Sequence, residues 1–95
     1  MWYEIKLTIM SKSIKELGAI VRHMYESATR KELVARVHLS GILYHKEIRL
    51  AGVKEVTHAS GIGEKYGAEI NKGVKLGQYV TVSPEVKTQL NLPHS

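Results

Sequence analysis

The residues of this chain that could carry out chemistry are histidines, glutamates and basic side chains, because the sequence contains neither aspartate nor cysteine. All nine acidic residues are glutamates, and fourteen lysines and arginines stand against them. A cysteine nucleophile and a thiolate metal site are therefore excluded. The aspartate-centred magnesium sites of kinases and many nucleases are excluded as well. We expect a binding protein with no enzymatic activity and no cofactor.

The five histidines do not form a metal-binding pattern. They occur at positions 23, 38, 45, 58 and 94, without a His-x-x-x-His or comparable ligand spacing. His38 and His45 would be diagonal neighbours on a predicted hairpin, near Glu47, which leaves a two-histidine site as the alternative. We predict no metal site and expect the histidines to serve as surface or phosphate contacts.

Composition and charge indicate a single globular domain over residues 1–95 with an anionic partner. Hydrophobic residues make up 43% of the chain, so a disordered chain is not expected. The net charge of +5 favours anionic partners, of which nucleic acid is the commonest. No apolar run approaches a membrane span, and the first four residues do not resemble a secretory signal. We expect a cytoplasmic protein with no membrane partner, and the absence of cysteine agrees with this.

Two segments near the N-terminus carry clear local signals. Residues 2–10 alternate between apolar and polar side chains, which predicts a half-buried strand. Ser13 and Glu16 have the spacing of a capping box, in which the two side chains bond free amides at the start of a helix. Apolar residues then recur at helical spacing from Ile14 to Ala28, which predicts a helix.

Two runs of alternating residues predict a β-hairpin. The runs 33–39 and 42–50 meet at Ser40-Gly41, which would form a two-residue loop. This register places apolar pairs on one face: Leu33 with Ile48, and Val37 with Tyr44. Thr29 and Glu32 also fit a capping box, but the alternation that follows them favours the hairpin over a second helix.

The rest of the chain completes an α+β pattern. Residues 51–73 permit interrupted helical turns weakened by glycines, so a helix and a loop both stay open. Residues 74–82 predict a strand, and Ser83-Pro84-Glu85 predicts a terminal helix that ends near Leu90. The order β-α-β-β-α-β, followed by a short C-terminal helix, predicts a ferredoxin-like fold. If residues 51–73 form a loop, the sheet is antiparallel-rich with a single covering helix.

In this fold, the sheet face opposite the helices would gather cations and aromatic side chains. Such a face suits nucleic acid, because cations neutralise phosphates and aromatic rings stack on bases. The predicted nucleic-acid-binding residues are Lys6, Arg36, His38, His45, Arg49, Lys75 and Tyr79. The alternative is a solvated sheet surface, or one that pairs with a second copy of the chain.

Residues 61–70, Gly-Ile-Gly-Glu-Lys-Tyr-Gly-Ala-Glu-Ile, locally resemble a helix-hairpin-helix motif. The resemblance implies a Gly-hydrophobic-Gly turn between two short helices, whose backbone amides bind a DNA phosphate. It gives Gly61, Gly63 and Lys65 as a phosphate loop. Gly67 stands where the motif usually has Ala, and Ala59-Ser60 replaces its usual hydrophobic-Pro pair. A flexible glycine loop is the alternative.

We therefore predict a small non-enzymatic protein that binds nucleic acid, either DNA or RNA, through a basic sheet face. The alternative is a protein-binding inhibitor or regulator, such as a phage- or plasmid-encoded factor that acts on a nucleic-acid-binding host protein or complex. Salt dependence separates the two, because phosphate contacts weaken steeply with salt and a well-packed protein interface need not. A homodimer is also predicted. A monomer mass from light scattering over a wide concentration range would contradict it.

Overall fold

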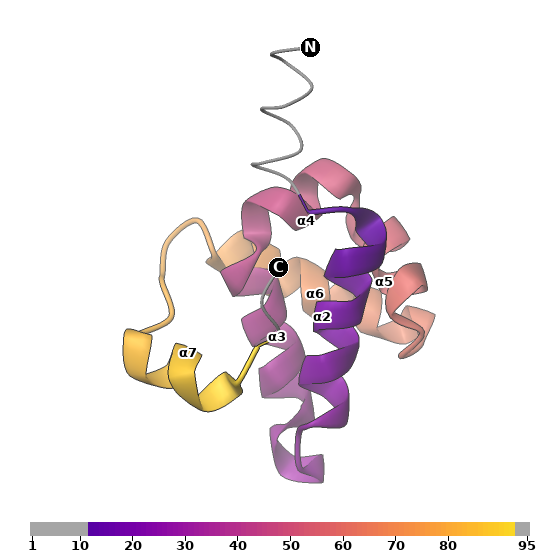
Figure 1. The fold of residues 1–95 in the computed structure, drawn as a ribbon. Coiled ribbons are helices and arrows are strands. Elements are labelled where there is room, and N and C mark those ends of the chain that lie inside the picture. The colour runs from indigo at the N-terminus through magenta and orange to yellow at the C-terminus, as the bar shows by residue number, and fades with distance from the viewer. Residues whose placement is uncertain (1–11, 93–95) are drawn as a thin grey trace.

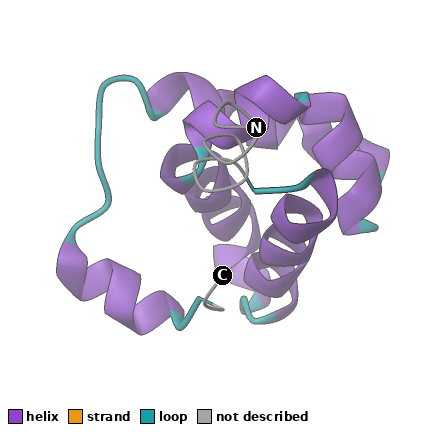
Figure 2. Cartoon of the chain, turned by 45° about the horizontal axis from the view of Figure 1, so that its top comes forward, coloured by secondary structure: helices purple, strands orange, loops and turns teal. Residues whose placement is uncertain are grey.

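A computed structural model describes residues 12–92, which fold into helices joined by turns (Figure 1). Six α-helices follow one another in this range: α2 (Ile14–Glu26), α3 (Leu33–Leu43), α4 (His45–Ala51), α5 (Val53–Ser60), α6 (Gly67–Leu76) and α7 (Pro84–Leu90). Two short 3-10 helices precede α3 and α6: η1 (Arg30–Glu32) and η2 (Glu64–Tyr66). Residues 12–92 contain no strand (Figure 2).

The ferredoxin-like α+β fold predicted from the sequence is therefore wrong. The prediction of a basic sheet face is wrong as well, because it depends on that fold. The two halves of the predicted hairpin, 33–39 and 42–50, lie in α3 and α4. The predicted strand 74–82 comprises the end of α6 and part of the connection to α7. The predicted strand 2–10 lies outside the described residues.

The two helices with strong capping signals are confirmed. α2 begins after Ser13, whose hydroxyl accepts a hydrogen bond from the Glu16 amide at 3.0 Å. The Glu16 carboxylate accepts one in return from the Ser13 amide at 2.9 Å. α7 begins at Pro84 after Ser83, whose hydroxyl accepts a bond from the Val86 amide at 3.3 Å. These bonds satisfy amides that have no partner within the helix, so both starts are set locally.

α3 is a helix whose buried side is made largely of small residues. Its buried residues are Val37, Ser40 and Gly41, which lie on one face at helical spacing. A Cβ atom on Gly41 would lie 2.5 Å from the carbonyl oxygen of Ile70 and 2.9 Å from the Cα of Gly73. Ser40 and Gly41 therefore lie on the buried side of α3, with Gly41 in close contact with α6, and do not form the loop of a hairpin.

The helices pack around one aliphatic core. α3 packs chiefly against α6, and α2 packs chiefly against α5. Gly18 brings α2 close to α5, since a Cβ atom there would lie 2.8 Å from the Cβ of Ala59. The buried residues of the core are Leu17, Val21, Val37, Ile48, Val56, Ile70 and Val74. Figures 1 and 2 both show α7 set apart from the other helices at the end of the connection 77–83, although its Leu90 side chain is buried.

Candidate nucleic-acid interface

A glycine turn joins α5 to the helical residues that follow it. α5 ends at Ser60 and is capped by Gly61, which has a φ of 72°, and Gly63 has a φ of 122°. Both angles lie in the region that favours glycine, because a Cβ atom would be strained there. η2 leads directly into α6, so residues 64–76 form one continuous helical stretch after the turn 61–63. We call residues 64–76 the second helix, because they follow α5 across this turn.

The second helix has two distinct faces. Its buried residues are Ile70, Gly73 and Val74, and Gly73 lies against the backbone of α3. The exposed residues recur at helical spacing on the other side: Glu64, Lys65, Ala68, Lys72, Lys75 and Leu76. We call the four residues Lys65, Ala68, Lys72 and Lys75 the lysine face.

Both carboxylates of the second helix are bonded to histidines from other helices. Oε1 of Glu69 lies 2.6 Å from Nε2 of His38 on α3, and its Oε2 lies 3.4 Å from Nζ of Lys72. Oε2 of Glu64 lies 3.1 Å from Nδ1 of His58 on α5. The hydrogen bond from His38, assisted by Lys72, lowers the pKa of Glu69 against the opposing effect of partial desolvation. Glu69 is therefore ionised at neutral pH, and its two oxygens are shared between a histidine and a lysine.

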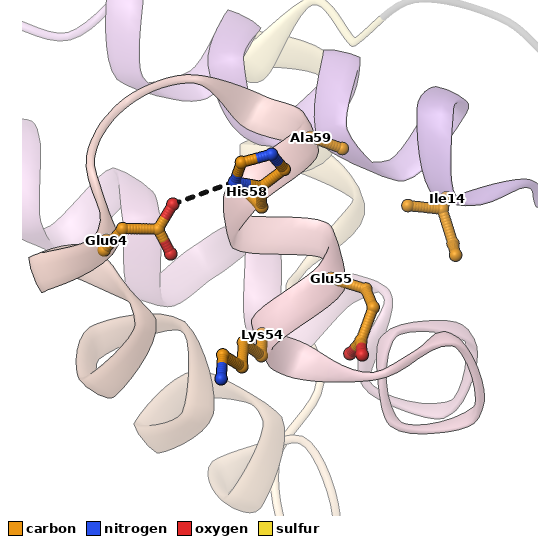
Figure 3. A pocket seen from close by; sticks show the side chains of 6 residues that line it. All are labelled: Ile14, Lys54, Glu55, His58, Ala59 and Glu64. Carbon is orange, nitrogen blue, oxygen red and sulfur yellow. Dashed lines mark hydrogen bonds and ion pairs between the residues drawn. The ribbon is translucent and has the colours of Figure 1, made fainter.

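The outer side of α5 borders an open depression, which is seen from close by in Figure 3. The depression has a volume of about 500 Å³ and is lined by Ile14, Lys54, Glu55, His58, Ala59 and Glu64. Figure 3 shows the His58–Glu64 pair on one side of it and Ile14 of α2 on the other. Its lining has two carboxylates and one lysine, so it suits a phosphate backbone less well than the lysine face does.

The predicted site residues of α3 and α4 make separate local contacts. On α3, Nη1 of Arg36 lies 3.5 Å from the hydroxyl of Ser27, and His38 is bonded to Glu69. On α4, the His45 ring lies against Gly77 and its Nδ1 is 3.1 Å from the Ile42 carbonyl oxygen, whereas Arg49 is exposed. The sheet face on which these residues were expected to lie together does not form within residues 12–92.

Other predicted residues do come together. Lys65 and Lys75 lie on the lysine face, and Gly61 and Gly63 form the turn that precedes it. Tyr79 follows α6 and is 82% exposed. Lys6 lies outside the described residues. A role for any of these residues in binding stays a prediction.

Sequence reasoning missed Ala68 and did not place Lys72 among the site residues. The signal for both is the spacing 65, 68, 72 and 75, which puts the four residues on one side of a helix. The interpretation of residues 74–82 as a strand hid this signal, because it placed Lys75 in a different element from Lys65.

Two further structural findings bear on function. Within residues 12–92, no three or more His and Glu side chains are grouped so that they could hold a metal ion. In the part of the chain that the structure describes, no helix has both the length and the apolar character needed to cross a membrane.

Comparison with known proteins identifies the family of the chain. No curated protein and no solved structure matches it significantly. A family model described as an HTH-like domain, where HTH denotes helix-turn-helix, matches residues 13–83. This range covers more than half of the chain and includes every helix from α2 to α6. The chain therefore belongs to the HTH-like domain family.

Proposed function

We propose that this protein binds duplex DNA, without catalysing a reaction, by placing its second helix in the major groove. An HTH-like domain is typically non-enzymatic and suggests DNA binding by a helix rather than by a sheet face. In a helix-turn-helix, one helix crosses the DNA backbone while the next lies in the major groove. α5, the turn 61–63 and residues 64–76 fit this arrangement, because a short glycine-containing turn joins two helices.

The lysine face is the observation that carries the proposal. Lys65, Lys72 and Lys75 place three ammonium groups on the exposed side of the second helix, and Ala68 keeps that side small between them. Ammonium groups neutralise DNA phosphates and release counterions, which is the main source of affinity. Lysine also donates to O6 and N7 of guanine in the major groove, and alanine can contact the methyl group of thymine. One exposed surface can therefore supply both phosphate and base contacts.

The preceding pair of helices is less suited to this role. α4 and α5 are joined through Gly52 alone, and the outer side of α5 carries Glu55 beside Lys54. Carboxylates on this side would face phosphates of the same charge. We therefore assign the groove-binding role to residues 64–76 rather than to α5.

Removal of two lysines tests the proposal. The double substitution Lys65→Ala and Lys75→Ala should weaken binding to a labelled mixed-sequence DNA duplex. It should also flatten the plot of log affinity against log salt by about 0.9 for each lost phosphate contact. Fluorescence anisotropy titrations at several salt concentrations measure both quantities.

Lys31 and Lys87 provide the matched control, because they are exposed but lie on η1 and α7. Replacing this pair with alanine makes the same change in net charge away from the second helix. If the control pair weakened binding as much as the pair on the lysine face did, the role of the second helix would be contradicted. If the wild type bound no duplex at low salt, DNA binding itself would be contradicted.

A further inference from the structure

The glutamates of the second helix are both paired with histidines from other helices. Residues 64–76 contain three lysines and two glutamates, and each glutamate is bonded to a histidine from another helix. The His38–Glu69 pair is the more enclosed of the two, with 30% and 26% of the side chains exposed. The His58–Glu64 pair is open to solvent, with 84% and 66% exposed. Each negative charge beside the lysine face is therefore paired with an imidazole from another helix.

The His38–Glu69 pair reaches the lysine face through Lys72. Oε1 of Glu69 is 2.6 Å from Nε2 of His38, and Oε2 is 3.4 Å from Nζ of Lys72. An ionised carboxylate only accepts hydrogen bonds, so Nε2 of the neutral imidazole carries the hydrogen and Nδ1 is free to take a proton. While His38 is neutral, Lys72 is the group that balances the charge of Glu69.

We propose that DNA binding by the lysine face is coupled to the uptake of a proton by His38, which makes the affinity rise as the pH falls. Protonation of Nδ1 gives an imidazolium that balances Glu69 by itself. The positive charge of Lys72 then becomes available to a DNA phosphate. His38 acts as a positioning residue, because it works through Glu69 and Lys72 without touching DNA. This inference rests on the proposed function and adds that DNA affinity is regulated by pH.

The neighbouring charged groups leave this coupling intact. Within residues 12–92, Glu69 forms ion pairs with His38 and Lys72 alone. On α2, Glu26 is paired with Arg22, and on α4 the Nδ1 of His45 lies beside the Ile42 carbonyl oxygen. The His58–Glu64 pair links α5 to the start of the second helix and is exposed, and exposed ion pairs are weak. Lys54 and Glu55, which line the depression beside His58, have opposite charges and offset one another.

Anisotropy titrations with a labelled DNA duplex at about pH 7.5 and about pH 5.5, at constant salt, test the inference. The wild type should bind about three- to fivefold more tightly at the lower pH. His38→Gln keeps a hydrogen-bond donor for Glu69 but cannot be protonated, so it should lose most of this gain while its affinity at the higher pH stays unchanged. Glu69→Gln should bind at the higher pH about as tightly as the wild type does at the lower pH. His45→Gln is the matched control and should keep the gain.

The outcomes separate this inference from the proposed function. If His38→Gln kept the full gain, or if Glu69→Gln bound DNA more weakly than the wild type, the coupling would be overturned. Wild-type binding that is equally tight at both pH values would also overturn it, while DNA binding itself would stand. The absence of DNA binding at both pH values would overturn the proposed function and the inference together. A purely structural role for His38 would lower the melting temperature of His38→Gln without changing the pH dependence of DNA affinity.

Discussion

Ala68 is the smallest side chain of the lysine face, and it is exposed on the first turn of α6. Its sequence position lies between those of Lys65 and Lys72 on the same side of the helix. In the proposed DNA complex, a small residue at this position would allow the backbone of the second helix to come close to the edges of the bases. The only apolar group that the major groove offers there is the methyl group of thymine, which an alanine side chain can contact.

Ala68→Glu should abolish DNA binding without unfolding the protein. The longer side chain would hold the helix away from the groove and place a carboxylate among phosphates, which costs several kcal/mol of binding free energy. Because Ala68 is exposed, the free energy of unfolding should change by no more than about 0.5 kcal/mol. Anisotropy titration and urea denaturation measure the two effects. Ala19→Glu, on the exposed side of α2, is the control, and equal affinities of the two variants would contradict the assignment.

Single residues also show why part of the sequence interpretation failed. Glycine marks both tight turns and places where two backbones come close together, and the residue type alone does not separate the two. The sequence pattern predicts a hairpin loop at Ser40-Gly41, but Gly41 lies in close contact with α6. Its partner Gly73 is far along the chain, so a local pattern does not reveal the contact. Gly61 and Gly63 were predicted as a turn, and their positive φ values confirm the turn, although not its binding role.

At the scale of elements, the crossing of α3 and α6 holds the lysine face in place. A Cβ atom on Gly73 would lie 3.1 Å from the Cα of Gly41 and closer still to the carbonyl oxygen of His38. The backbones of the two helices are therefore in direct contact, and the His38–Glu69 bond joins them beside this crossing. The buried side of the second helix is fixed, and its exposed side is presented in one orientation.

Two glycines of α6 should respond in opposite ways to substitution by alanine. Gly73→Ala forces α3 and α6 apart and should lower the free energy of unfolding by roughly 1–3 kcal/mol. Gly67→Ala is the control, because its Cβ would lie 3.5 Å from Oγ1 of Thr57, an ordinary contact, and its φ of −56° is helical. It should raise the free energy of unfolding by about 0.5–1 kcal/mol, since alanine favours a helix over glycine. Urea denaturation measures both values, and a Gly73→Ala protein as stable as the wild type would contradict the close crossing.

The elements that could be predicted from the sequence are those with local signals. α2 and α7 start at capping residues, whose bonds are made within one turn, and both helices are confirmed. α3 and α4 lack side-chain caps, and the alternation of Leu33, Val37 and their neighbours imitates a strand. Thr29 does precede a helical turn, η1, but its side chain makes no capping bond. The lysine face can be predicted from helical spacing only after residues 64–76 are known to form one helix.

At the scale of the whole molecule, the net charge of +5 attracts any polyanion over a distance but does not select a surface. In the proposed function, selection would come from the shape of the second helix and of the groove that it enters. The major groove of B-form DNA admits an α-helix, whereas that of an RNA duplex is too deep and narrow. The proposed binding mode therefore favours DNA over double-stranded RNA, a choice that composition and charge left open. The homodimer stays a prediction.

The central claim, that residues 64–76 bind duplex DNA, is tested most directly by NMR. Backbone amide shifts of isotope-labelled protein are followed during titration with a short DNA duplex, and with an RNA duplex of the same sequence as the control. The largest changes should occur in residues 61–76, with small changes in α2 and α7 and little response to the RNA duplex. Changes confined to residues outside 61–76, or no change with DNA at low salt, would contradict the claim.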